Sequence, residues 1–241
     1  MGDLDSIFPD VRAHYEGLNV PVIQIRDQYS TDFTKCIWHL RSNRRDIVSS
    51  VSCESRPQNP PSGNASQISD SDVDYDLDVV VLGGLGGRVD QAFSQVHHLY
   101  MFSQLSTPDS TRPSGGLYLV SEESISFLLQ RGHNTILTPG GSKLGPGVNN
   151  GGHPESHARD SSHLDFICLA ENVGIIPISG PASITTSGFE WDVKDWKTEF
   201  GGQLSTSNHI RADVVTVETS VPVMFTAELP EWLKFSRSWR R

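Results

Sequence analysis

Two aspartates separated by one residue, Asp3 and Asp5, stand in the segment Gly2-Asp3-Leu4-Asp5-Ser6. Mg²⁺ prefers hard oxygen ligands, and proteins usually hold it with one or two carboxylates together with substrate phosphates. A D-x-D loop therefore predicts a site for a metal ion that carries a polyphosphate. The ordinary alternative for an isolated D-x-D is a solvated acidic turn.

A second acidic cluster, residues 27–32, reads DQYSTD and lies between two expected elements. The apolar run from Val20 to Ile25 predicts a short strand. The sequence TDFTKCIWHLRS that begins at Thr31 has helical spacing, and Thr31 or Asp32 is expected to cap it. The cluster is thus predicted to occupy a strand-to-helix junction, where α/β proteins bind ligands.

The start of this predicted helix has the groups that a phosphate needs. The first turn presents backbone N–H donors. Lys35 follows Thr31 by one helical turn and is expected to project toward the same place. The alternative is that Thr31 and Asp32 serve only as capping residues.

A third candidate is the glycine-rich segment GGLGGRVDQ, residues 83–91. It follows a predicted strand at residues 77–82 and precedes a predicted helix at residues 90–105. It matches neither the phosphate-binding loop pattern nor the dinucleotide fingerprint. Its glycines let a ligand approach the backbone, and Arg88 could pair with phosphate in a fork geometry. The alternative is a tight turn with a solvated arginine.

The fourth candidate, residues 185–192, reads TTSGFEWD. The indole of Trp191 with a nearby hydroxyl could hold a flat heteroaromatic cation by stacking and cation–π attraction. Most tryptophans in such positions belong to a core or a sheet face, which is the alternative here.

Composition narrows the class of protein. The 241 residues carry a formal charge of −10, which argues against a nucleic-acid partner. The three cysteines form no C-x-x-C pair and are expected to be reduced thiols. No apolar run approaches the roughly 18–20 residues of a membrane span, so no membrane partner is expected. The first residues lack a basic, apolar leader, and a cytoplasmic location is expected.

The elements divide the chain into two predicted domains. Repeated strand–loop–helix units, including a short helix at residues 122–129, favour an α/β fold with a parallel, Rossmann-like sheet over residues 1–130. Short strands separated by turns favour an antiparallel β-sandwich over residues 131–241. The strands of this part are expected at residues 134–137, 166–169, 173–178, 182–186, 205–208, 212–218 and 223–227. Polar stretches at residues 49–76 and 139–162 are expected to be flexible insertions. Residues 231–241, with Trp232 and Trp239, form a basic tail.

The four candidate segments, in this order, resemble the thiamine pyrophosphokinase (thiamine diphosphokinase) family. Residues 173–178, 200–208 and 214–223 match as well, and the resemblance covers nearly the whole chain apart from the insertions and the tail. It implies transfer of a pyrophosphoryl group from ATP to the thiamine hydroxyl, giving AMP and thiamine diphosphate. It also implies an α/β catalytic domain, a β-sandwich that binds thiamine, and a homodimer with active sites at the subunit interface.

The resemblance assigns roles residue by residue. It implies that three carboxylates hold Mg²⁺ and the polyphosphate, and that one of them takes the proton of the attacking hydroxyl: Asp3, Asp5 and Asp32. It implies an ATP-binding set made of Gln28, Thr31, Lys35, Arg88, Asp90 and Gln91. It implies that Ser187 and Trp191 hold thiamine, from the partner subunit.

The family has a strand–helix–strand region before the D-x-D loop that this sequence does not contain. We therefore expect an N-terminally truncated catalytic domain whose chain alone is poorly stable and weakly active or inactive. Two alternatives stay open from the sequence. One is another Mg²⁺-dependent α/β nucleotide transferase that uses the same acidic loops. The other is a non-catalytic remnant that binds thiamine or dimerises.

Overall fold

The computed structural model of the chain describes residues 1–47, 77–103, 115–143 and 169–234. Contacts divide the chain into two compact units. The first comprises residues 1–77 and 113–115, and the second comprises residues 78–112 and 116–241. The domain boundary after residue 130 stays a prediction.

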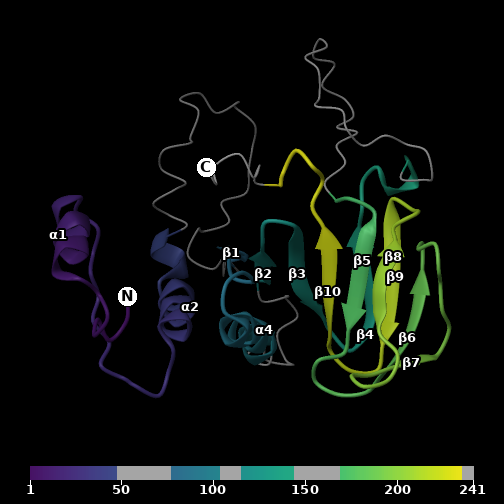
Figure 1. Cartoon of the computed structure of the whole chain (residues 1–241), viewed down its shortest axis with the longest axis horizontal. Helices are drawn as coiled ribbons and strands as arrows, with labels where there is room; N and C mark the ends of the chain where they lie inside the picture. The colour runs from purple at the N-terminus through teal and green to yellow at the C-terminus, as the bar shows by residue number, and fades with distance from the viewer. Residues whose placement is uncertain (48–76, 104–114, 144–168, 235–241) are drawn as a thin grey trace, which may run out of the picture. The chain divides into compact units, whose positions relative to one another are not determined.

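The first unit contains the helices α1 (Pro9–Gly17) and α2 (Asp32–Ser42) (Figure 1). The sequence did not predict α1, which has proline in its first turn and no buried residue. The prediction of a strand at residues 20–25 is wrong, because among the described residues this segment makes only an isolated parallel bridge, between Gln24 and Gly2. Two hydrogen bonds form this bridge, from Gly2 N to Ile23 O at 3.2 Å and from Ile25 N to Gly2 O at 2.8 Å.

Helix α2 begins as its sequence predicts. Thr31 is the N-cap, and its hydroxyl accepts a hydrogen bond from Thr34 N at 3.1 Å. Ile37 is buried, with 2% of its surface exposed. The cap fixes the direction in which the DQYSTD segment enters the helix.

The second unit starts with a parallel β–α–β arrangement. Strand β1 (Val79–Leu82) pairs in parallel with β2 (Leu117–Val120), and α4 (Val89–Ser103) contacts β2. Val96, Leu99 and Phe102 form the buried face of α4. The expected α/β class is confirmed for this part of the chain.

The remaining strands form a sandwich with antiparallel pairing. One sheet has the order β1-β2-β3-β10-β5-β8, and the other has the order β4-β9-β6-β7 (Figure 1). Their bounds are β3 (Ser124–Leu129), β4 (Gly132–Leu137), β5 (Asn172–Ile176), β6 (Ala182–Ser187), β7 (Trp196–Thr198), β8 (Ser205–His209), β9 (Val214–Thr219) and β10 (Val223–Glu228). A 3₁₀ turn, η1 (Gly141–Lys143), follows β4. The sequence predicted these strands apart from β3 and β7. One further strand was expected at residues 166–169, and its residues 166–168 lie outside the described part of the chain. Residues 49–76, 144–162 and 235–241 also lie outside it.

The short helix expected at residues 122–129 is wrong, because this segment is β3. Ser121 N donates to Ser124 O at 2.8 Å, which closes a tight turn directly after β2. The next six residues then pair with β10 along its whole length and with part of β2. A helix would leave the inner edges of β2 and β10 without backbone partners, so sheet pairing overrides the local pattern.

The core lies between the two sheets. It includes Phe225 of β10 and Ile175 of β5 from one sheet, and Ile184 of β6 and Val217 of β9 from the other. Phe189, from the turn after β6, packs in the same cluster. The core therefore continues directly into the TTSGFEWD segment.

Lys234 fixes the end of the described chain to the six-stranded sheet. Its Nζ lies 2.5 Å from Glu228 Oε1, 2.7 Å from Glu231 Oε1 and 3.4 Å from Glu123 Oε2. These contacts, led by the Glu228 hydrogen bond, raise the pKa of Lys234. Burial raises the pKa of Glu228, but the hydrogen bonds from Lys234 and Asn172 outweigh it, so that this pKa is lowered.

We expect Lys234→Met to lower the free energy of unfolding by about 1–2 kcal/mol near neutral pH, because it leaves three carboxylates without their cation. A raised lysine pKa stabilises the fold below the ordinary lysine pKa, and the effect is lost at higher pH. A lowered glutamate pKa stabilises it above the ordinary glutamate pKa, and the effect is lost in acid. The difference between variant and wild type should thus be largest between about pH 5 and 10. Urea unfolding against Lys194→Met, an exposed lysine, tests this; equal losses in the two variants would contradict it.

Among the residues described, none of the helices combines the length and the apolar character that crossing a membrane requires.

Candidate functional site

The D-x-D loop is a tight turn beside the bridge of the first unit. Asp3 Oδ1 accepts a hydrogen bond from Asp5 N at 3.2 Å, and Gln24 Nε2 donates to Asp3 O at 3.0 Å. Leu4, between the two aspartates, has φ of 64°, in the left-handed region that such residues rarely adopt. A strained turn whose carboxylates are partly or fully exposed is typical of a ligand-binding loop.

Asp32 joins this loop through Gly2. A Cβ built on Gly2 would lie 2.5 Å from Asp32 Oδ2, so any other residue at this position would require the Asp32 carboxylate to move. The Asp32 side chain is 55% exposed, and its Oδ1 accepts a hydrogen bond from Lys35 Nζ at 3.1 Å. The structure thus brings the N-terminus of α2 and the start of the D-x-D loop together.

Lys35 is the buried cation of this group, with 4% of its surface exposed. The pKa of Asp3 is lowered, first by the Asp5 backbone N–H and further by the charge of Lys35. The pKa of Asp27 is lowered by the Ser30 hydroxyl and the Tyr29 N–H, again with a contribution from Lys35. Asp3 and Asp27 are therefore carboxylates at neutral pH.

The donor set fits a metal ion that shares its coordination with phosphate. The Asp32 carboxylate beside Gly2, and the partly or fully exposed carboxylates of Asp3 and Asp5 in the adjoining loop, offer hard oxygen ligands. Within the described residues, no group of three or more His, Cys, Asp or Glu side chains is close enough to bind a metal ion by itself. One or two carboxylates with a substrate phosphate are the arrangement that this geometry permits.

The other residues predicted for ATP lie in two places. Gln28 and Thr31 belong to the first unit, where Gln28 is exposed and Thr31 caps α2. Arg88, Asp90 and Gln91 belong to the second unit, at the start of α4.

Arg88 and Asp90 form an exposed ion pair in the glycine-rich segment. Arg88 Nε and Nη2 donate to the two oxygens of Asp90 at 3.1 and 2.5 Å, and these bonds lower the pKa of Asp90. Gly83 and Gly87 have φ of 79° and 76°, which glycine adopts without strain. The segment therefore turns sharply twice between β1 and α4, and it places the exposed Arg88–Asp90 pair at the start of α4.

The predicted thiamine residues lie on one loop after β6. Asp192 organises this loop: its Oδ2 accepts from Gly188 N at 3.0 Å, and its Oδ1 accepts from Thr186 Oγ1 at 3.0 Å and Phe189 N at 3.2 Å. Ser187 is exposed at the end of β6. Trp191 is 54% exposed, so the alternative that it is a core residue is excluded.

Three residues beside this loop were missed by the sequence reasoning. Asn208 holds the backbone of Trp191 on both sides, accepting from Trp191 N at 3.2 Å and donating to Trp191 O at 3.0 Å. The His209 ring lies 5.0 Å from the Trp191 ring between centroids, at 46°. Arg211 forms ion pairs with Glu190 and Glu171. Asn208 falls in the matched stretch STSN, but no local pattern pointed to the other two.

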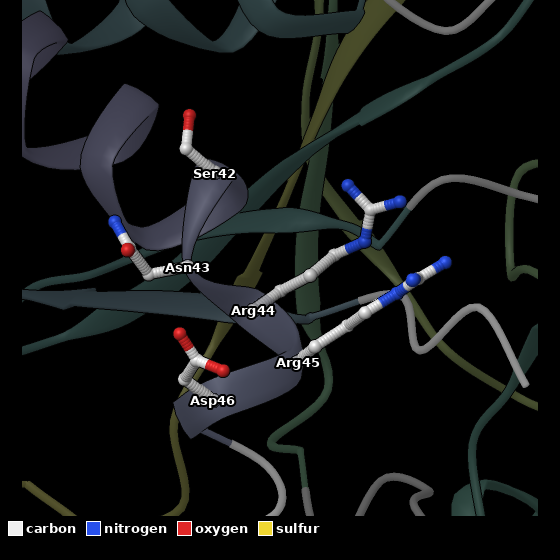
Figure 2. Close-up of a pocket in the computed structure, with 5 residues that line it drawn as sticks. All are labelled: Ser42, Asn43, Arg44, Arg45 and Asp46. Carbon is white, nitrogen blue, oxygen red and sulfur yellow. The ribbon is translucent and has the colours of Figure 1, made fainter. Parts of the chain in front are cut away.

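A pocket of about 340 Å³ lies at the other end of α2, lined by Ser42, Asn43, Arg44, Arg45 and Asp46 (Figure 2). Figure 2 shows the guanidinium groups of Arg44 and Arg45 extending to the same side, away from Asn43. An 11-residue helix is about 16 Å long, so this pocket is far from Thr31 and Asp32. It contains none of the predicted site residues.

Comparison with known proteins identifies the family of this chain. The family model described as "Thiamin pyrophosphokinase, catalytic domain" matches residues 1–108, and that described as "Thiamin pyrophosphokinase, vitamin B1 binding domain" matches residues 162–224. Together they cover more than two thirds of the chain. The chain belongs to the thiamine pyrophosphokinase family.

Individual relatives give the same result. The chain is 26% identical over 230 residues to "Thiamine pyrophosphokinase 1" of Oryza sativa subsp. japonica and 27% identical over 230 residues to "Thiamine pyrophosphokinase 1" of Arabidopsis thaliana; each match covers 95% of this chain and 64% of the relative. A solved structure, "Thiamin pyrophosphokinase from Candida albicans", superposes with a TM-score of 0.65 and 27% identity, covering 95% of this chain and 71% of that one. The chain thus spans somewhat less than two thirds of the length of these plant relatives.

Proposed function

We propose that this chain acts as a thiamine diphosphokinase, transferring a pyrophosphoryl group from ATP to the hydroxyl of thiamine. The proposal rests mainly on the first unit, where the D-x-D loop, Asp32 and the buried Lys35 lie together around Gly2. In addition, the second unit has an exposed tryptophan, Trp191, on a loop that is held by several hydrogen bonds. The first group suits a metal-bound polyphosphate, and the second suits a flat cation.

In the proposed reaction the protein positions two substrates and offsets charge. One or two of Asp3, Asp5 and Asp32, together with substrate phosphate, would hold Mg²⁺, which would supply positive charge to offset that of the polyphosphate. Lys35 adds a fixed positive charge beside Asp32, and Thr31, with the first N–H groups of α2, borders the same space. One of the ionised carboxylates accepts the proton of the attacking hydroxyl.

The residues of the second unit complete the proposal. Arg88 would bind ATP with Asp90, Gln91 and, from the first unit, Gln28. Ser187 and Trp191 would hold thiamine, and the active site would form between the subunits of a homodimer. The dimer, the metal and the cytoplasmic location stay predictions.

We expect AMP release from ATP by this chain, at whatever rate it occurs, to require both thiamine and Mg²⁺. Trp191→Ala should raise the KM for thiamine by about tenfold or more and leave the KM for ATP within about twofold, because stacking and cation–π contacts with the ring are lost. Trp232→Ala, a change at another partly exposed tryptophan, is the matched control.

Three outcomes of this assay contradict the proposal in different ways. AMP release that does not depend on thiamine would indicate another nucleotide transferase. Thiamine binding without turnover, with Mg²⁺ and ATP present, would indicate the non-catalytic alternative. An unchanged thiamine KM in Trp191→Ala would remove Trp191 from the site.

A further inference from the structure

The Trp191 ring and the Trp191 backbone are held by different residues. Asn208 makes two hydrogen bonds to the backbone, at 3.2 and 3.0 Å. The ring is in contact with His209, with centroids 5.0 Å apart, yet 54% of Trp191 remains exposed. The backbone contacts fix where the loop runs, but the direction of an indole also depends on what packs against the ring.

His209 is itself fixed by charged neighbours. Its Nδ1 lies 2.9 Å from Glu190 Oε2 and 2.9 Å from Arg211 Nη2. Arg211 pairs with Glu190 through Nη2 and with Glu171 through Nη1, the latter at 2.7 Å. The side chains of His209, Arg211, Glu190 and Glu171 are only 21–35% exposed.

Backbone pairing holds this group in register. Glu190 N donates to His209 O at 2.8 Å, and Arg211 N donates to Gly188 O at 2.9 Å. Ile210 N donates to Glu171 O at 2.9 Å, which places Glu171 beside Arg211. The imidazole therefore has little freedom, and it contacts an indole whose residue remains 54% exposed.

We propose that His209 is a positioning residue for Trp191, held by Glu190, Arg211 and Glu171, and that it orients the indole so that an exposed face is presented to the thiamine cation. This inference rests on the proposed function, because it names what orients the thiamine-binding ring. His209 acts through the indole, and no contact of its own with thiamine is required.

The first test does not need thiamine. The full chain has five tryptophans, so a protein labelled with 5-fluorotryptophan gives five ¹⁹F signals, and Trp191→Phe identifies that of Trp191. We expect His209→Ala to shift or broaden the Trp191 signal and to leave the other four in place. His209→Phe, which keeps an aromatic ring at this position, should restore a single sharp signal. His133→Ala, at an exposed histidine of β4, is the control and should change none of them.

The second test measures thiamine. His209→Ala should raise the dissociation constant and the KM for thiamine about fivefold, the size expected from loss of one aromatic contact, while kcat and the KM for ATP stay within about twofold. His209→Phe should recover most of the thiamine affinity, and His133→Ala should equal wild type.

Each result decides something. An unchanged Trp191 signal in His209→Ala overturns the inference, whatever thiamine does. A changed signal with unchanged thiamine affinity, in a wild-type protein that binds thiamine, also overturns it and leaves the proposed function standing. A wild-type chain that binds no thiamine overturns the proposed function and this inference together.

Discussion

Replacing Lys35 by methionine should lower kcat/KM for thiamine-dependent AMP formation by about 100- to 1,000-fold, the range seen when a preorganised electrostatic partner of a transition state is removed. Lys35 is 4% exposed and donates to Asp32 Oδ1 at 3.1 Å, so its charge is fixed before substrate arrives. It also lowers the pKa values of Asp3 and Asp27 as a secondary cause. The variant loses both the charge beside the proposed polyphosphate site and the hydrogen bond to Asp32.

The same substitution should have little effect on the fold. Methionine is close to lysine in volume and suits a buried position. Removing one partner of an ion pair is costly mainly when the charge that remains is buried. The carboxylate left behind is 55% exposed and stays hydrated. We therefore expect the free energy of unfolding to change by less than about 1 kcal/mol.

Enzyme assays at saturating Mg²⁺ with urea unfolding of the same samples check both expectations. Lys197→Met, an exposed lysine of β7, is the control and should match wild type in both. Activity of Lys35→Met within fivefold of wild type would remove Lys35 from the reaction. A large loss of stability would assign it a role in the fold instead.

Signals that are local in sequence predicted the first part of the candidate site. The Thr31 cap, the apolar face with Ile37 and the one-turn spacing to Lys35 all depend on residues within two helical turns. They therefore predicted α2 and its cap correctly, although the segment before α2 forms no strand. The role of Gly2 could not be predicted in this way, because it depends on a contact with Asp32 thirty positions away.

Non-local pairing explains the errors in the fold. Residues 124–129 contain serine, isoleucine, phenylalanine and leucine in an order that suits either a short helix or a strand. The choice is made by β10, which lies about 100 residues later and pairs with all six residues. The segment at residues 20–25 has a strand composition but only one bridging partner, Gly2, so it forms no ladder.

The same limit applies to the surroundings of Trp191. TTSGFEWD identified the loop, whose hydrogen bonds to Asp192 span only a few residues. The group around His209 assembles Glu171, Glu190 and Arg211 from positions up to 40 residues apart, and the residues between them form β5, β6, β7 and β8. Charged residues at such spacings form no recognisable sequence pattern, because only the pairing of the strands brings them together. Their contacts could therefore not be predicted from the sequence.

The core of the second unit gives the largest expected effect on stability. Phe225→Ala should lower the free energy of unfolding by about 3–5 kcal/mol, as the loss of a buried phenylalanine usually does. Phe225 is 0% exposed in the middle of β10, opposite Phe127 of β3 and Ile175 of β5. Its ring lies 5.3 Å from that of Phe127 and 6.5 Å from that of Phe189, so no single neighbour can fill the space it leaves.

Urea unfolding monitored by circular dichroism measures this loss, with Phe200→Ala as the control, because Phe200 is 58% exposed and should cost less than about 1 kcal/mol. A loss below about 1.5 kcal/mol for Phe225→Ala would mean that the core collapses around the vacated space.

The contact with Phe189 adds a functional consequence, since Phe189 lies two residues before Trp191 in the loop that Asp192 organises. Thiamine affinity should therefore weaken in Phe225→Ala at urea concentrations where the protein is still folded, whereas Phe200→Ala should bind thiamine as wild type does.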